Sequence, residues 1–205
     1  MPLPTIAALW MHGPLSFLEQ LCLKSFVDAG HRVVLYHYGP LENVPAGVEL
    51  ADAHGIAPQT SLLTHARPEG VTLQSDLFRY RLLAQSDNTV WADTDAYCVK
   101  PFQITNGHFY GWRSQDHVGA GVLALPADSD TLRALLRHTQ DEFAIPRWYG
   151  RDYEQDLTAR RDAGAPVHVS EQPRGVWGPH ALTHFLKETG ELAHALPRDA
   201  FYPIA

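Results

Sequence analysis

The sequence is poor in cysteine and in long hydrophobic runs, and it carries no excess of positive charge. Cys22 and Cys98 are the only cysteines among 205 residues, and their spacing is not that of a metal site. We expect two reduced thiols, with a single disulfide as the alternative. No apolar stretch approaches the roughly 18 residues of a membrane-spanning helix. The net charge of −7 argues against a partner that is nucleic acid or an anionic membrane, because both require a basic surface.

The first residues also lack the features of a secretory signal. They carry no basic segment before the apolar one, and prolines stand at positions 2 and 4. We therefore expect a cytoplasmic protein. The length fits a single domain over residues 1–205, and the 45% hydrophobic content is ordinary for a globular protein with a sizeable core.

The order of apolar segments indicates an α/β protein. Residues 5–10 and 32–36 read as strands, and the apolar spacing over 16–29 predicts a helix between them. Such a strand–helix–strand opening is typical of nucleotide-binding sheets. We therefore predict a Rossmann-type mixed central sheet flanked by helices. Further strands are expected at 48–51, 108–112 and 118–125, and further helices from Ser129 to Phe143 and from Pro179 to Lys187.

Two aspartates follow a short apolar run. Residues 89–92 predict a buried strand that ends in Asp93-Thr94-Asp95. If strand geometry continues through Asp95, both carboxylates project from one face, at the strand end where ligands gather in open α/β sheets. Such a pair can hold Mg²⁺ or Mn²⁺ with coordination positions left for phosphate oxygens. The alternative for so short a motif is a solvated turn or a helix cap.

The helix before this strand carries a second charged pair. We expect Ser75 to be its N-cap, with Asp76 in the first turn and Arg79 three residues further on the same face. A carboxylate beside a guanidinium suits a polyhydroxylated, phosphorylated ligand. The alternative is an ion pair on a solvated face, but this helix is apolar on nearly every side and has little such face.

These motifs together resemble a known enzyme family. Ser75-Asp76-x-x-Arg79-Tyr80, then an apolar helix and a strand ending in Asp93-Thr94-Asp95, is similar to glycosyltransferases with a sugar-binding region containing DXD. That family includes α1,4-galactosyltransferases, initiating α-mannosyltransferases and capsular polysaccharide enzymes. The match is specific over residues 73–102, and Gly178-Pro179-x-x-Leu182-Thr183 supports it. The resemblance implies one GT-A-like domain, with the donor half in residues 1–102 and the acceptor half in 103–205.

The resemblance also implies roles for individual residues. Asp95 would coordinate Mn²⁺ or Mg²⁺, and Asp93 would assist it while contacting ribose or sugar. Trp10 has core packing as its alternative role, and Asp116 could simply belong to a polar hairpin turn. The residues implied to bind substrate are Asp76, Arg79 and Tyr80 for the donor sugar, Trp10, His12 and Gly13 for the nucleoside, Asp116 for the acceptor, and Gly178 and Pro179 for the diphosphate.

The implied reaction is transfer of a hexose from a nucleotide diphosphate sugar to a hydroxyl of a glycan or glycolipid. UDP is favoured over GDP, retention of configuration is expected, and any membrane contact would be peripheral, through the acceptor. One alternative is a haloacid-dehalogenase-like phosphatase, which also places Asp-x-Asp after a buried strand, although Tyr97 stands where that family has Thr or Val. Another alternative is a non-catalytic relative that binds sugar nucleotides.

The sequence departs from the family pattern in two places. Relatives place an Asn in the strand where Gly119, Ala120 and Gly121 stand here. They also continue beyond a Phe-Tyr-Pro segment, here residues 201–203, to a tail with His, Asn or Trp that completes the metal shell. Three explanations remain open for the tail: the chain is truncated, His180 and His184 replace it, or the metal is held loosely.

Overall fold

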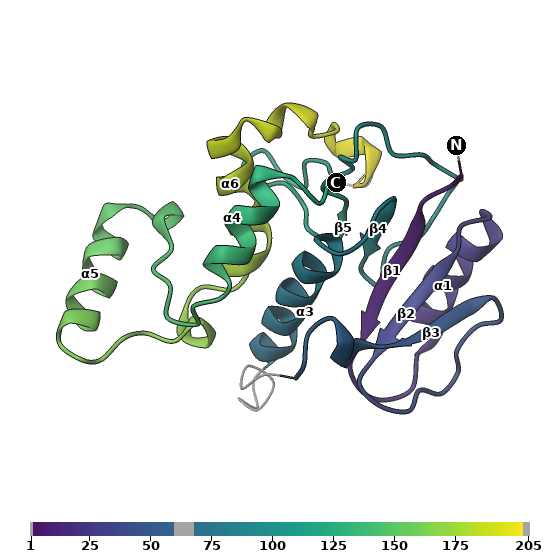
Figure 1. Cartoon of the computed structure of the whole chain (residues 1–205), viewed down its shortest axis with the longest axis horizontal. Coiled ribbons are helices and arrows are strands. Elements are labelled where there is room, and N and C mark those ends of the chain that lie inside the picture. Colours follow the sequence, from purple (N-terminus) through teal and green to yellow (C-terminus); the bar gives the residue numbers. More distant parts are fainter. Residues whose placement is uncertain (1, 60–67, 203–205) are drawn as a thin grey trace.

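A central sheet of five strands organises the protein. The computed structural model describes residues 2–59 and 68–202. The strand order is β3-β2-β1-β4-β5; the first four are parallel and β5 runs antiparallel to β4 (Figure 1). The mixed Rossmann-type sheet predicted from the sequence is therefore confirmed. The strands are β1 (Thr5–Trp10), β2 (Val33–His37), β3 (Val48–Asp52), β4 (Thr89–Ala92) and β5 (Val122–Leu123).

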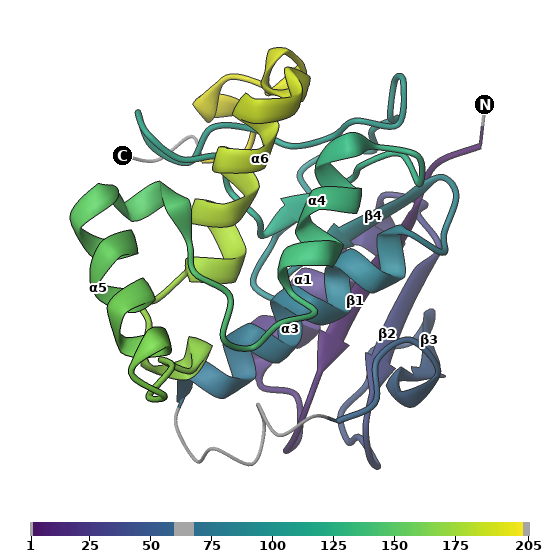
Figure 2. The same cartoon turned by 60° about the vertical axis from the view of Figure 1, so that its left-hand side comes forward.

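Helices cover both faces of this sheet. Successive side chains of β1 point to opposite faces and therefore pack in two different cores. Ile6 and Ala8 pack with Leu23 and Phe26 of α1, whereas Ala7 joins residues of α3, α4 and α6. Helix α4 contacts both α3 and α6, and α5 stands away from the sheet (Figures 1 and 2). The main helices are α1 (Phe17–Asp28), α3 (Pro68–Leu83), α4 (Asp130–His138), α5 (Arg151–Asp162) and α6 (Ala181–Thr189).

Local chemistry explains where α1 begins. The Ser16 hydroxyl accepts a hydrogen bond from the amide of Leu18, and the Glu19 carboxylate accepts one from the amide of Ser16. This reciprocal arrangement is a capping box, which satisfies amide groups that would otherwise lack partners. The helix predicted over 16–29 is thereby confirmed to within one residue at each end. None of the helices within residues 2–59 and 68–202 is long and apolar enough to cross a membrane.

Helix α3 begins earlier than the sequence predicted. It starts at Pro68, a favourable first residue for a helix, so Ser75 and Asp76 lie in its interior. The prediction that Ser75 is the N-cap was therefore wrong. Leu73 explains the extra turns, because it packs in one cluster with Trp177 from the C-terminal part of the chain. Tertiary packing thus extends the helix through a stretch that carries only a weak local signal.

Two other predicted elements are shorter than expected. Residues 108–112 and 118–125 form isolated bridges and the two-residue β5 rather than long strands, partly because Gly111 pairs with Leu196 instead. The turn between them is present, since the amide of Arg113 donates to the carbonyl of His117 at 2.9 Å. Helix α4 begins as expected at its N-cap Ser129 but ends at His138, which leaves Phe143 outside it and 40% exposed.

Candidate functional site

The carboxyl edge of the sheet collects the predicted donor-site segments. Strands β1 and β4 are parallel neighbours, with Thr5 opposite Thr89 and Ala7 opposite Trp91. The residues that follow these strands, 11–13 and 93–95, therefore leave the sheet at the same edge. In open α/β sheets this edge is the usual place for a ligand.

The acid pair lies in a turn and not on a strand. Strand β4 ends at Ala92, and the amide of Ala96 donates to the carbonyl of Asp93 at 2.9 Å. Strand geometry therefore does not continue through Asp95, which was the condition for strand alternation to carry both carboxylates to one face. The turn leaves 38% of the Asp93 side chain exposed, and Asp95 is exposed. The two acids thus have different surroundings although they are two residues apart.

Arg79 joins helix α3 to the end of β4. Its Nη2 atom lies 3.3 Å from Asp76 Oδ1 and 3.4 Å from Asp93 Oδ1. Its Nη1 atom donates to the carbonyl of Ala120, and its guanidinium lies 4.9 Å from the ring centroid of Trp91. The side chains of Asp76 and Arg79 are only 3% and 5% exposed. The spacing of three residues therefore forms a buried ion pair and not a solvated one.

Asp76 is held without a full set of partners. Its Oδ2 atom is buried and makes no hydrogen bond to the described residues. A Cβ atom at Gly178 would lie 3.0 Å from that oxygen, so glycine gives the chain room for this close approach, and a side chain there would crowd Asp76. Burial raises the pKa of Asp76 to about 6; the positive charge of Arg79 opposes this shift and Asp93 adds to it. A buried carboxylate with a free oxygen is costly, which suggests a role other than stability.

Asp93 and Asp95 form the outer part of the same site. Asp93 Oδ1 accepts a hydrogen bond from the indole nitrogen of Trp91 at 2.8 Å, while Oδ2 faces Gly121. The protein around it raises the pKa of Asp93 through loss of hydration, and Arg79 opposes this shift. Asp95 makes no hydrogen bond or ion pair with the part of the chain that the structure describes. When all are ionised, the three acids and Arg79 leave two uncompensated negative charges.

This arrangement fits a divalent cation that is shared with a ligand. Within residues 2–59 and 68–202, no group of three His, Cys, Asp or Glu side chains is placed to hold a metal. Mg²⁺, however, is commonly bound by one or two carboxylates together with substrate phosphates and water. Asp95 and the Oδ2 atom of Asp93 could supply such carboxylate oxygens. A cation there would also neutralise the acidic edge.

The two histidines considered as substitutes for the family's tail have other partners. His184 Nε2 lies 3.3 Å from Glu188, and His180 Nδ1 lies 2.6 Å from the hydroxyl of Tyr149. Burial lowers the pKa of His180, and the neighbouring His117 and Arg113 lower it further. The structure therefore does not gather His180 and His184 with the acids as a replacement metal shell.

The predicted nucleoside residues lie at the end of β1. The indole nitrogen of Trp10 donates to the carbonyl of Gly13 at 2.9 Å, and the loop turns at Gly13 with a φ of +80°. His12 is exposed in this turn, and Trp10 is half-buried and packs on its inner side against the core. These three residues share the carboxyl edge with the acid pair, and their nucleoside role stays a prediction.

Other predicted substrate residues are placed differently. Tyr80 is 0% exposed and its hydroxyl donates to the carbonyl of Trp177, so it joins helix α3 to the C-terminal part and cannot reach a ligand here. Pro179 lies inside the π-helical turn Val176–His180 and is not the first residue of α6. Asp116 is exposed in the turn that also carries His117, whose ring lies 4.5 Å from that of His180.

Two aromatic residues of the site were missed from the sequence. Trp91 holds both Asp93 and Arg79, and its position two residues before the first aspartate was the available signal. Tyr202 packs with its hydroxyl against Gly119, and nothing in the local sequence indicated that contact. Gly119 and Gly121 allow close approach of Tyr202 and Asp93 respectively.

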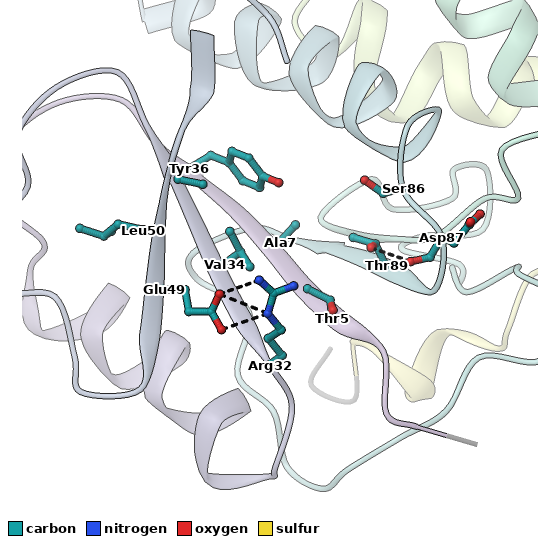
Figure 3. A pocket seen from close by; sticks show the side chains of 11 residues that line it. Thr5, Ala7, Arg32, Val34, Tyr36, Glu49, Leu50, Ser86, Asp87 and Thr89 are labelled. Atoms are coloured by element: carbon teal, nitrogen blue, oxygen red, sulfur yellow. Dashed lines mark hydrogen bonds and ion pairs between the residues drawn. The ribbon is translucent and has the colours of Figure 1, made fainter. Parts of the chain in front are cut away.

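A separate hollow lies near the opposite end of the strands. It encloses about 390 Å³ and is bordered by Thr5 and Thr89, where β1 and β4 begin (Figure 3). Arg32 and Glu49 pair across its rim, with Nη2 2.6 Å from Oε2. The hollow contains neither aspartate of the acid pair, so we place the candidate site at the carboxyl edge instead.

Comparison with known proteins supports the fold. No protein-family model matches the chain, and no curated protein matches it. In contrast, 19 chains of solved structures match. One of them, the PaToxG glycosyltransferase, superposes with a TM-score of 0.55 over 92% of this chain and 70% of that one, at 12% sequence identity. An identity this low carries information on the fold alone. The chain therefore has a GT-A-like glycosyltransferase fold, as the sequence predicted.

Proposed function

We propose that the protein is a metal-dependent glycosyltransferase that moves a hexose from a nucleotide diphosphate sugar, with UDP favoured, to a hydroxyl of a glycan or glycolipid. The observation that carries this proposal is the buried ion pair of Asp76 and Arg79, joined to the partly exposed Asp93 and lying beside the exposed carboxylate of Asp95. Replacing buried ion pairs by apolar residues is often neutral or stabilising, so such a cluster is weak evidence for a stabilising role. Its position at the ligand-binding edge of a GT-A-like sheet supports a functional one.

The charge of the site is the reason to propose a cation. The three carboxylates and one guanidinium carry a net negative charge when ionised. This charge would repel a diphosphate unless a positive ion lay between them. Asp95 and Asp93 Oδ2 would hold Mn²⁺ or Mg²⁺. When bound, the metal would supply Lewis-acid stabilisation of the charge that develops on the leaving diphosphate.

The buried residues would act mainly by positioning. Arg79 keeps the Asp93 carboxylate in place through Oδ1 and leaves Oδ2 free. Asp76 fixes Arg79 from the other side, and its own free oxygen faces Gly178. Contact of Asp76 or Arg79 with the donor sugar remains part of the proposal, and it would require the segment around Gly178 to shift, because both side chains are buried.

Retention of configuration also belongs to the proposal. We assign no enzyme nucleophile, because none is expected for the retaining enzymes that the sequence resembles. The phosphatase alternative requires a carboxylate nucleophile, and Tyr97 stands where that family has Thr or Val. A non-catalytic relative would share the nucleotide site and would differ only in turnover.

Isothermal titration of UDP and GDP, each with and without Mn²⁺, tests the proposal. We expect one nucleotide to bind only with the metal, and Asp95→Ala to abolish that binding because it removes the open ligand. Asp87→Ala is a matched control, since Asp87 precedes the same strand at its opposite end. Absence of binding by the wild type under every condition would contradict the proposal. Turnover of the corresponding sugar nucleotide would then separate an enzyme from a non-catalytic relative.

A further inference from the structure

The C-terminal residues 196–202 are fixed beside the candidate site. The amide of Leu196 donates to the carbonyl of Tyr110 at 2.9 Å, and the amide of Trp112 donates back to Leu196 at 3.0 Å. The ring of Phe201 packs edge-on against Phe109, with centroids 5.1 Å apart. The segment is therefore attached to the 109–112 stretch by hydrogen bonds and by apolar contact.

Two glycines form the seat of this segment. A Cβ atom at Gly111 would lie 2.5 Å from the ring of Phe201, and one at Gly119 would overlap the hydroxyl of Tyr202. Real Cβ atoms do not approach other atoms so closely, so both positions require glycine for this arrangement. Gly111 precedes the 113–117 turn and Gly119 follows it. The two aromatic side chains therefore pack on the two segments that flank this turn.

The seat places the Tyr202 hydroxyl next to the acid pair. A Cβ atom at Gly121 would lie 3.0 Å from Asp93 Oδ2 and 3.7 Å from the Tyr202 hydroxyl, so both oxygens border the same glycine. The hydroxyl makes no hydrogen bond with the described residues. Burial raises the pKa of Tyr202; Asp93 and Asp95 add to this shift, while Arg113 and Arg79 oppose it. A tyrosine hydroxyl is protonated at neutral pH and can donate a hydrogen bond.

We propose that Tyr202 is a substrate-binding residue whose hydroxyl donates a hydrogen bond to the diphosphate of the sugar nucleotide. This inference rests on the proposed function. Tyr202 lies within electrostatic reach of the positive Arg113 and of the acids that would hold the cation. A diphosphate bound to that cation would bring anionic oxygens to the Tyr202 hydroxyl, which has no hydrogen-bond partner among the described residues.

Titration of the wild type and of Tyr202→Phe with Mn²⁺ and either UDP or GDP tests this inference. The variant keeps the ring and loses only the hydroxyl. We expect its Kd for the nucleotide that binds to rise about tenfold, the usual effect of removing one hydrogen bond to a charged group. The corresponding nucleoside monophosphate should lose less than about threefold, because it lacks the second phosphate. Tyr153→Phe, which removes a hydroxyl on helix α5, should bind like the wild type.

Gly119→Ala provides a second test from the other side of the contact. The added methyl group displaces Tyr202, so we expect a similar loss of affinity, and the double variant with Tyr202→Phe should lose little more. If the wild type binds and Tyr202→Phe binds equally well, this inference fails and the proposed function stands. If both nucleotide forms lose affinity equally, the contact is not with the diphosphate and the inference also fails. If the wild type binds neither nucleotide with Mn²⁺, both proposals fail.

Discussion

Charged residues at the two ends of the sheet differ in how far their side chains are exposed. Near the amino end, Arg32 and Glu49 form an ion pair in which both side chains are more than half exposed (Figure 3). At the carboxyl edge, Asp76 and Arg79 are almost fully buried, and Asp93 adds a second negative charge. Exposed pairs contribute little to stability, whereas buried charges lose their hydration. The proposed function accounts for this difference, because it assigns the carboxyl-edge cluster to ligand binding and gives the amino-end pair no role.

The largest effect should come from removing the only cation of the buried cluster. Arg79→Met leaves Asp76 and Asp93 without their shared partner, so we expect a loss of about 3–5 kcal/mol in the free energy of unfolding. Urea denaturation at pH 8 measures it. Arg32→Met is the matched control from the exposed pair and should change the unfolding free energy little. Equal effects of the two substitutions would remove the contrast between the two ends.

A smaller effect of opposite sign is expected from Asp76→Asn. The pKa of Asp76 is raised from its ordinary value of 3.8 to about 6, so the fold favours the protonated form. The stability that this preference contributes is fully present below pH 4 and is lost as the pH rises through 6. At pH 8 the neutral asparagine should therefore stabilise the protein by about 1–3 kcal/mol, and at pH 4 by almost nothing.

The same variant separates stability from function. Asp76→Asn should reduce nucleotide-sugar turnover while raising the unfolding free energy at pH 8. Urea denaturation of wild type and variant across pH 4–8 gives the stability difference. A variant that is less stable than the wild type at pH 8 would show that the ionised carboxylate helps to hold the fold.

The smallest effect concerns a half-buried titratable group outside the site. His138 of helix α4 packs beside Trp148, and its Nε2 atom makes no hydrogen bond to the described residues. Burial lowers its pKa to about 4; Asp141 opposes this shift and His184 adds to it. Stability due to the neutral ring is present above pH 6.5 and is lost as the pH falls towards 4.

We expect His138→Phe to lose this part of the acid sensitivity, with an amplitude of about 2 kcal/mol between pH 7 and pH 4.5. Urea denaturation at the two pH values measures it. His194→Phe, at an exposed histidine, is the control and should leave the pH dependence unchanged. An unchanged pH dependence in His138→Phe would show that this histidine is not buried as a neutral ring.

Much of the fold could be predicted because short-range signals agree with it. The apolar runs of β1, β2 and β4 and the capping box at Ser16 are local features, and the structure confirms the elements that they predict. The start of α3 could not be predicted, because it depends on packing of Leu73 against a distant segment. The turn at Asp93 likewise overrode the strand pattern that precedes it.

The candidate site was predictable only in part. The sequence pattern predicted Asp76, Arg79 and the acid pair as site residues. The structure places Asp76, Arg79 and Asp93 in one cluster. The approach of Gly178 to Asp76 and of Gly119 to Tyr202 joins residues that are far apart in the chain. Tyr80 was predicted to bind the donor sugar because it directly follows Arg79 in the chain. Its side chain is buried in the core instead.

A crystal structure with Mn²⁺ and the nucleotide that binds tests the central claim most directly. The anomalous signal of manganese locates the ion independently of the nucleotide. We predict a manganese peak within about 2.5 Å of Asp95, with the diphosphate as its other ligand at the carboxyl edge. Nucleotide bound instead in the hollow bordered by Arg32 and Glu49, or manganese bound away from Asp93 and Asp95, would contradict the account.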